Sequence, residues 1–241
     1  MENIESIILH ILRLVFNNGE KSSRYWFKHV LYPSVKKGLG NDMRVTIKQM
    51  LKNTKNWIKN PSCSQGFNDW TIVQDGGSGW TVGDWPHLLP IRRFTQKAFC
   101  GSYSHCVVEQ KIDLSLLKEQ IGKEPCSMEA GAYTSRRWDC GCTATVKIVL
   151  TGEDDKPTYE AERTVSEELP TEGPFTKGYC FKLISFKCFD YKVIMGAKQA
   201  ILTLSTRDEK MWSGQFAARF TDMYVRFIPL SYYAKPPLTP S

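Results

Sequence analysis

From residue 70 onward, the sequence consists of short runs in which β-branched or aromatic residues alternate with polar ones. In the clearest run, 143–150, every second side chain from Ala144 to Leu150 is apolar, which is the period of a strand with one buried face. Turn residues recur about every ten positions, so we predict an all-β fold, an antiparallel β-sandwich of about ten strands. The expected strands are 70–73, 79–82, 97–101, 106–112, 143–150, 158–165, 179–188, 199–205, 214–220 and 223–228.

Helical spacing of apolar residues is found mainly before these runs. It predicts short N-terminal α-helices at 4–16 and about 43–58, the second closed by Asn60-Pro61. A further short helix is expected at 114–122, between strands. The predicted division of the chain is an N-terminal helical segment at 1–57, a sandwich domain at 58–230 and a flexible tail at 231–241.

The formal net charge of +7 arises in the N-terminal quarter of the chain. Residues 1–60 hold eleven Lys and Arg against four Asp and Glu, which leaves 21 of each for the other 181 residues. The basic residues form no compact run, so we interpret them as a solvated helical face and expect no nucleic-acid partner. An alternative is contact with an anionic membrane surface through Lys48, Lys52 and Lys55.

The N-terminus lacks the pattern of a secretory or membrane-spanning segment. Its longest apolar stretch, Ile7 to Phe16, contains His10 and Arg13 and is far shorter than the roughly 20 residues that a span needs. Glu2 and Glu5 stand where a signal peptide would be basic. We therefore expect a cytoplasmic protein whose eight cysteines are reduced and pack as small apolar groups.

Cys140-Gly-Cys142, with His105 and Cys106 elsewhere, raises the question of zinc, because thiolate and imidazole are the ligands that zinc prefers. However, zinc sites usually space their paired ligands as C-x₂₋₄-C. His105 and Cys106 also fail as a base and nucleophile pair, because adjacent strand residues point to opposite faces. We expect no catalytic residues, no metal site and no cofactor, and therefore no enzyme.

Within a glycine-rich run, Asp75-Gly76-Gly77-Ser78-Gly79, the first three residues are expected to supply the positive φ values that a tight turn needs. The Lys-Ser/Thr pair of a phosphate-binding loop does not follow it. The run therefore predicts a tight hairpin turn between the strands at 70–73 and 79–82.

Several segments, taken in chain order, resemble the F-box-associated (FBA) domain. The most specific is Arg137-Trp138-Asp139-Cys140-Gly141-Cys142, which is similar to the family's Arg-aromatic-Asp-Cys-Gly-Cys signature. The resemblance covers about residues 58–229 and implies a ten-stranded antiparallel sandwich. The signature or structural positions in this sequence are Trp70, Gly76, Gly77, Trp80, Arg137, Asp139, Cys140, Gly141 and Cys142.

The resemblance also implies a ligand site. In sugar-binding members, loops at one end of the sandwich hold the base of an N-glycan core with one aromatic residue and a Tyr-Trp-Lys triplet. The corresponding positions here are Tyr103 and Met211-Trp212-Ser213, so the tryptophan remains while the tyrosine hydroxyl and the lysine ammonium are absent. Each sugar hydroxyl left unpaired would cost about 1–3 kcal/mol. The alternative role for Tyr103 and Trp212 is ordinary core or rim packing.

The segment before the sandwich resembles only part of an F-box. Residues 4–15 are similar to its first helix, and 1–57 would be a degenerate F-box remnant. The chain resembles the F-box-only sugar-binding proteins and, more nearly, the F-box-poor branch that contains the non-specific cytotoxic cell receptor protein.

Two hypotheses follow from this resemblance. In one, the chain recognises glycoproteins for ubiquitin-dependent, ER-associated degradation, and its helices dock on a Skp-type adaptor of a cullin ligase. In the other, it is a free-standing FBA protein that binds protein ligands in immune recognition or cell proliferation. An exposed apolar face on the helix at 4–16 would favour the first hypothesis.

Overall fold

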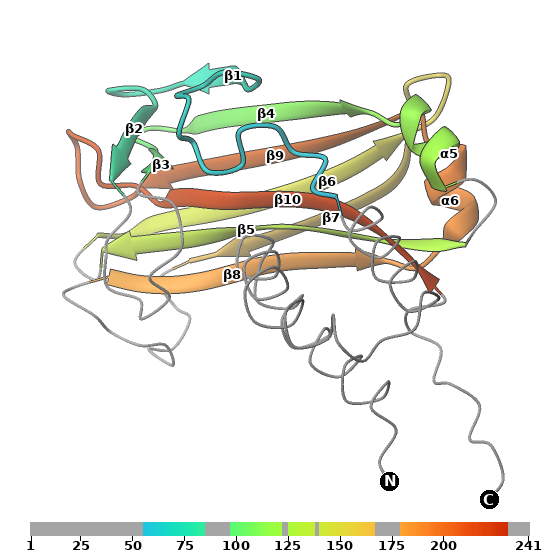
Figure 1. Cartoon of the computed structure of the whole chain (residues 1–241). Helices are drawn as coiled ribbons and strands as arrows, with labels where there is room; N and C mark the ends of the chain where they lie inside the picture. The colour runs from blue at the N-terminus through green and yellow to red at the C-terminus, as the bar shows by residue number, and fades with distance from the viewer. Residues whose placement is uncertain (1–54, 85–96, 122–124, 138–139, 167–178, 231–241) are drawn as a thin grey trace, which may run out of the picture. The chain divides into compact units, whose positions relative to one another are not determined.

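The computed structural model describes residues 55–84, 97–121, 125–137, 140–166 and 179–230, and it contains two five-stranded antiparallel sheets (Figure 1). The prediction of a ten-stranded antiparallel sandwich is therefore confirmed. The first sheet has the order β1 (Thr71–Asp75), β4 (Cys106–Asp113), β9 (Gln199–Asp208), β6 (Cys142–Thr151), β7 (Pro157–Val165). The second has the order β2 (Thr81–Asp84), β3 (Lys97–Cys100), β10 (Arg219–Pro229), β5 (Cys126–Arg137), β8 (Tyr179–Cys188).

Two short helices lie at one end of the sandwich, α5 (Ser115–Ile121) and α6 (Tyr191–Gly196) (Figure 1). The first agrees with the helix predicted at 114–122. The second follows β8 directly, and the side chain of Asp190 caps it by accepting a hydrogen bond from the N–H of Val193 at 3.2 Å. Among the helices of the described residues, none has the length and apolar character that a membrane span requires.

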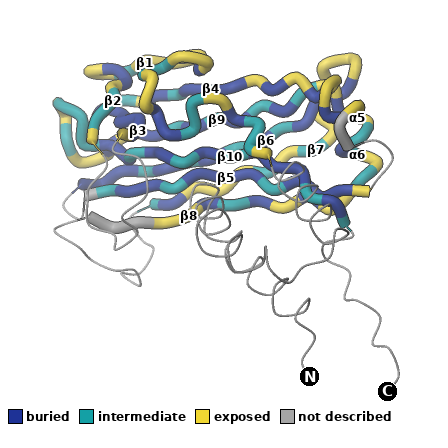
Figure 2. The backbone as a smooth tube through the Cα atoms, in the orientation of Figure 1, coloured by how far each residue is buried: buried dark blue, intermediate teal, exposed yellow. Residues whose placement is uncertain are grey.

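The core lies between the sheets, and it forms because alternate residues of the strands point inward (Figure 2). In β6, Val146, Ile148 and Leu150 are fully buried, as their alternation in the sequence predicts. Phe99 of β3 is a central core residue: the Phe67 ring stacks on it with a centroid distance of 4.5 Å, and Trp70 packs edge-on at 5.4 Å.

The strand β5 was not predicted from the sequence. Its middle, Ala130-Gly131-Ala132, consists of small buried residues and contains none of the β-branched residues that mark a strand. Two strands flank it along most of its length, because β10 pairs with it on one side and β8 on the other. Tertiary pairing rather than local preference therefore makes this segment extended.

The predicted hairpin between β1 and β2 is wrong. β1 pairs with β4 in the first sheet, whereas β2 pairs with β3 in the second, so the glycine-rich run carries the chain from one sheet to the other. Of the three residues expected to supply positive φ, only Gly77 does so (66°), whereas Asp75 and Gly76 do not. Gly79, which was not part of that expectation, also has a positive φ (75°). The chain crosses because Trp80, directly after the turn, is buried between the sheets against Phe99 and Phe220.

The strands predicted at 214–220 and 223–228 form a single strand, β10, and residues 214–218 belong to the loop before it. The register of β10 against β5 shifts between Thr221 and Tyr224, where Asp222 has a positive φ of 48°. This irregularity interrupts the alternation and explains why the sequence suggests two separate strands.

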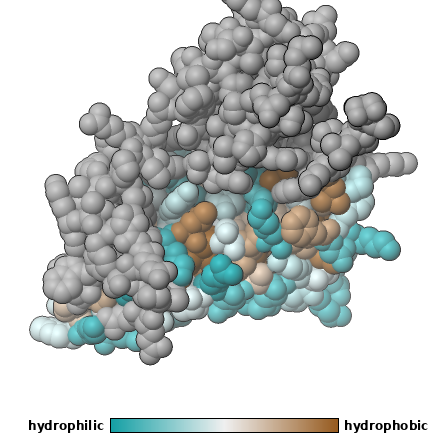
Figure 3. Space-filling view, turned by 90° about the horizontal axis from the view of Figure 1, so that it is seen from below, coloured by the Kyte–Doolittle hydropathy of each residue, from teal (hydrophilic) through white to brown (hydrophobic). Residues whose placement is uncertain are grey.

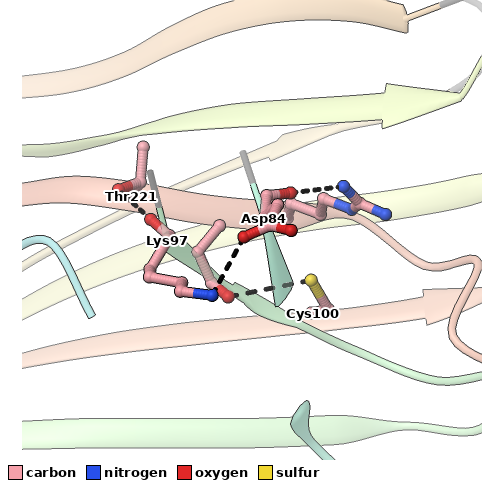
Figure 4. Close-up of polar contacts among 6 residues, drawn as sticks. Asp84, Lys97, Cys100 and Thr221 are labelled. Atoms are coloured by element: carbon pink, nitrogen blue, oxygen red, sulfur yellow. Dashed lines mark hydrogen bonds and ion pairs between the residues drawn. The ribbon is translucent and has the colours of Figure 1, made fainter. Parts of the chain in front are cut away.

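β10 pairs with β3 through only two residues, and side chains strengthen the junction (Figure 4). The guanidinium of Arg219 donates to the backbone oxygen of Asp84 at 2.6 Å, and the ammonium of Lys97 lies 2.9 Å from the Asp84 carboxylate. The hydroxyl of Thr221 donates to the backbone oxygen of Lys97 at 2.9 Å. These contacts hold the short strands β2 and β3 at the edge of the second sheet.

The helix predicted at about 43–58 is wrong for its last residues, because 55–58 contain no helical turn. Here the chain runs beside β10: Trp57 donates its N–H to the backbone oxygen of Val225 at 2.9 Å, and the ammonium of Lys55 lies over the Trp57 ring. Hydrogen bonding to β10 therefore replaces helical hydrogen bonding. The rest of that helix, the helix at 4–16 and the tail at 231–241 lie outside the described residues.

Candidate functional site

The loops that follow β1, β3, β5 and β9 lie together at the end of the sandwich opposite α5 and α6 (Figure 1). Hydrogen bonds join them directly. The N–H of Glu209, after β9, donates to the backbone oxygen of Gly141, after β5, at 2.8 Å, and the N–H of Asp208 donates to that of Ser102, after β3, at 3.2 Å. The N–H of Gly76, after β1, donates to the backbone oxygen of His105 at 3.2 Å. We call these segments, 76–80, 101–105, 140–141 and 209–218, the loop end.

Trp212 projects from the loop end and is 85% exposed. Its loop starts in a fixed turn, because the buried Asp208 carboxylate accepts hydrogen bonds from the N–H groups of Lys210 (2.9 Å) and Met211 (3.2 Å). Met211 is half-buried and Ser213 is exposed. The alternative that Trp212 is a core residue is therefore wrong, since its ring is open to solvent.

Other large apolar side chains that are exposed among the described residues are less exposed than Trp212. The face of the molecule seen from below mixes apolar and polar side chains (Figure 3). Leu183 and Phe189, at 36% and 56% exposure, belong to β8 and to the chain just after it. Single exposed apolar side chains are normal in folded proteins. Among the described residues, Trp212 is nevertheless both the largest of them and the most exposed.

Tyr103, the other predicted ligand residue, is half-buried in the loop after β3. Its ring lies against Gly77, where a Cβ atom would come within 3.0 Å of two ring carbons. The positive φ of 66° at Gly77 likewise favours glycine. Gly77 thus holds the chain close beneath the ring, while Gly76 passes close to Ser104 and His105.

The two signature tryptophans support this end of the sandwich from inside. Trp70 and Trp80 are buried at 7% and 6% exposure, and both pack against Phe99. The backbone N–H of Trp80 donates to the carboxylate of Asp75, which closes the glycine-rich turn. These residues therefore have a structural role beneath the loops, apart from the exposed Trp212.

The Arg137–Cys142 signature supports the Trp212 loop where it is described. Cys140, Gly141 and Cys142 are buried, and the stem of Lys210 passes over Gly141, where a Cβ would meet it at 2.6 Å. A side chain at Gly141 would therefore push Lys210 away. The side chain of Arg137 and all of Asp139 lie outside the described residues.

The thiols of Cys106 and Cys142 are buried, and their burial keeps them protonated at neutral pH. Burial raises the pKa of the Cys142 thiol to about 12, and it also raises the pKa of Cys106, whose sulfur donates to the backbone oxygen of Gly76. Cys106 points inward while the neighbouring His105 is exposed and contacts Gln74. In the part of the chain that the structure describes, no group of three or more His, Cys, Asp or Glu side chains could hold a metal ion.

Sequence reasoning missed Asp208 and Gln215 as residues that build the site. Gln215 donates through its side-chain nitrogen to the backbone oxygens of Ser78 (3.1 Å) and Gly79 (3.0 Å), and so joins the Trp212 loop to the glycine-rich turn. The turn that Asp208 forms could have been inferred from the sequence, since an Asp at the end of a strand commonly accepts hydrogen bonds from the N–H groups two or three residues on. Nothing in the sequence indicates the partners of Gln215.

The two five-stranded sheets and the loop end define the class of this protein, an antiparallel β-sandwich domain, and the family comparison gives that domain a name. The model of the F-box associated region, FBA, matches residues 49–227. The chain therefore belongs to the FBA family, and the resemblance seen in its motifs is confirmed.

Two curated relatives share this region. F-box only protein 6 of Bos taurus is 24% identical over 179 residues, 71% of this chain and 64% of that protein. F-box only protein 2 of Bos taurus is 26% identical over 184 residues, 72% of this chain and 59% of that protein. The chain thus spans about 60% of the length of the curated relatives it matches.

Solved structures resemble the chain more distantly. A carbohydrate-binding module specific for non-crystalline cellulose is 10% identical, with a TM-score of 0.46, over 73% of this chain and 97% of the module. At this level of similarity nothing about a ligand of the present chain follows.

Proposed function

We propose that this chain is a non-catalytic recognition protein that binds a glycoprotein through its loop end. The observation that carries the proposal is the 85% exposure of Trp212 on a loop that is bonded to its neighbours. An exposed indole is a large apolar surface with little conformational freedom, and tryptophan is enriched among the residues that dominate binding energy. Its flat face suits the apolar C–H face of a sugar ring.

Tyr103 supplies the second aromatic group of the proposed site. Its ring lies against Gly77 at the same end of the sandwich, and its hydroxyl can donate to or accept from a ligand. Met211 and Ser213 flank Trp212 without a phenol or an ammonium group. We therefore expect stacking on one or two sugar rings with fewer hydrogen bonds than the family's Tyr-Trp-Lys triplet would give.

Met211 and Trp212 favour the second candidate, an FBA protein whose ligand is a protein surface. A half-buried methionine beside an exposed tryptophan makes an adaptable apolar contact of the kind found at protein interfaces. In this candidate the chain acts in immune recognition or cell proliferation without attachment to a ligase.

A glycan array with the full chain tests the first candidate. Trp212→Ala and Tyr103→Ala should each abolish binding to N-glycans. Phe189→Ala, which removes an exposed aromatic side chain at the opposite end of the sandwich, should leave binding unchanged. If the unmodified chain binds no N-glycan at all, the glycan proposal is wrong and a protein ligand remains.

The first candidate also includes attachment of the chain to a ubiquitin ligase, and membership of the FBA family supports this. The segment expected to dock on a Skp-type adaptor is the predicted helix at 4–16, outside the described residues. Titration of the full chain with the adaptor should give saturable binding that Ile8→Lys and Leu12→Lys abolish. Absence of binding by the unmodified chain would favour the free-standing FBA protein.

A further inference from the structure

Ser102 occupies the centre of the loop end and is completely buried. Its hydroxyl accepts a hydrogen bond from the backbone N–H of Ser78 at 2.8 Å and donates one to the backbone oxygen of Gly214 at 3.1 Å. Its backbone oxygen accepts from the N–H of Asp208. One residue of the loop after β3 is thus bonded to the loops after β1 and β9.

Gln215 completes this arrangement from the other side. Its side chain bonds to the backbone oxygens of Ser78 and Gly79, and Ser78 also bonds to the Ser102 hydroxyl through its N–H. The chain from Gly214 to Gln215 is therefore held at two points, and Trp212 stands two residues before the first of them. Gly214, at a positive φ of 84°, turns the chain at this point.

These contacts explain how an exposed tryptophan can be held in place. A ring that is 85% exposed has few packing contacts of its own, so its position depends on the backbone that carries it. A loop that is ordered before binding avoids part of the entropy cost that a ligand would otherwise have to offset. Tyr103 follows Ser102 directly, so the same anchor also fixes the second aromatic group.

We propose that Ser102 is a positioning residue, whose buried hydroxyl fixes Trp212 relative to Tyr103 before a ligand arrives. The inference rests on the proposed function for the role of the two rings. It concerns the free protein, however, so the position of Trp212 can be tested without any ligand.

The test is ¹⁹F NMR of the full chain labelled with 5-fluorotryptophan, with resonances assigned by single Trp→Phe variants. In Ser102→Ala, the resonance of Trp212 should shift and broaden, while those of the buried Trp70 and Trp80 should stay in place. The matched control is Ser104→Ala in the same loop. Among the described residues, no hydrogen bond joins the Ser104 hydroxyl to another loop, so this variant should leave all three resonances unchanged.

A second variant separates loop positioning from general unfolding. If Ser102→Ala also moves the resonances of Trp70 and Trp80, Gln215→Ala decides, because Gln215 is only partly buried and should be replaceable without loss of the fold. It should disturb Trp212 alone. An undisturbed Trp212 in a folded Ser102→Ala variant, or in Gln215→Ala when Ser102→Ala unfolds, overturns the inference.

Binding by the same variants distinguishes this inference from the proposed function. For an N-glycan that the unmodified chain binds, Ser102→Ala should weaken affinity about tenfold while Ser104→Ala should not. If the unmodified chain binds no glycan but Trp212 still responds to Ser102→Ala, the glycan proposal fails and the positioning role stands. Equal affinities of Ser102→Ala and Ser104→Ala would contradict the positioning role.

Discussion

Gly77 lies directly beneath the ring of Tyr103, so close that a Cβ atom at position 77 would come within 3.0 Å of the ring carbons. The Ser102 hydroxyl oxygen lies closer still, 2.8 Å from such a Cβ. Gly77→Ala should therefore strain the backbone at φ 66° and displace both the Tyr103 ring and the Ser102 hydroxyl. We expect a loss of about 1–3 kcal/mol in the free energy of unfolding. Urea denaturation gives this quantity.

Gly66→Ala is the matched control for that prediction. Gly66 has nearly the same φ, 65°, but a Cβ there would meet no atom within 4 Å. It should show the backbone cost alone, about 1 kcal/mol. Equal losses in the two variants would mean that the close packing of Gly77 against Ser102 and Tyr103 adds nothing to the backbone cost.

Trp212 and Trp80 should respond oppositely to substitution. Trp212→Ala removes an exposed side chain and should change the free energy of unfolding by less than about 0.5 kcal/mol. Trp80→Ala empties a site in the core beside Phe99 and Phe220 and should cost about 3–5 kcal/mol. Thermal unfolding of both variants checks this, and a large loss in Trp212→Ala would refute the assignment of Trp212 to the surface.

Asn56 acts as a bridge between the start of the described chain and β10. Its side-chain oxygen accepts from the N–H groups of Val225 (3.2 Å) and Ile58 (3.1 Å), and its side-chain nitrogen donates to the backbone oxygen of Met223 (2.9 Å). Asn56→Ala should cost about 1–3 kcal/mol, because it leaves these backbone groups unpaired.

The neighbouring exposed Lys55 provides the comparison for Asn56. Lys55→Ala removes an ammonium that lies 4.6 Å from the centre of the Trp57 ring, and it should cost no more than about 1 kcal/mol. Chemical denaturation of both variants ranks the two contacts. If Lys55→Ala were the more damaging, the hydrogen bonds of Asn56 would not be what attaches this segment.

Stability should fall at alkaline pH. Burial raises the pKa of Cys142 to about 12 from an ordinary value of 9.0, so the unfolded chain releases this proton at a lower pH than the folded chain. The stabilisation from this group is complete below pH 9 and is lost between pH 9 and 12, at about 1.4 kcal/mol per pH unit. Tyr224, whose pKa burial raises to about 12, acts in the same direction.

Denaturation under reducing conditions at several pH values tests the Cys142 contribution. Cys142→Ala should reduce the slope of stability against pH above pH 9 and leave it unchanged below. Parallel curves for the two proteins over the whole range would show that Cys142 titrates alike in the folded and unfolded chains.

The fold could be predicted from the sequence where a strand has one buried face, because every second residue of such a strand is then apolar. β6 is such a strand, because Val146, Ile148 and Leu150 all face the core. β5 could not be predicted in this way, because Ala130 and Ala132 are small and not β-branched. Pairing with β10 and β8 makes the segment extended. Its conformation depends on partners that are distant in the sequence.

The two aromatic residues of the candidate site could be predicted from the sequence, but the hydrogen bonds that hold their loops could not. Motif resemblance selected Tyr103 and Trp212, and the structure places both at the loop end. The positive φ expected within Asp75-Gly76-Gly77 was correct at Gly77 alone. The predicted pairing of the two flanking strands was wrong, because a turn fixes the local backbone and leaves open which sheet each flanking strand joins.

That crossing between sheets has a mechanical consequence. The glycine-rich turn connects β1 of the first sheet to β2 of the second, and Ser102 joins the chain after β3 to the end of β9. A force applied to Trp212 therefore passes into both sheets through backbone hydrogen bonds, and a single hairpin cannot peel away under it. A molecule held at Trp212 and pulled away from this protein would therefore load both sheets together, rather than one pair of strands.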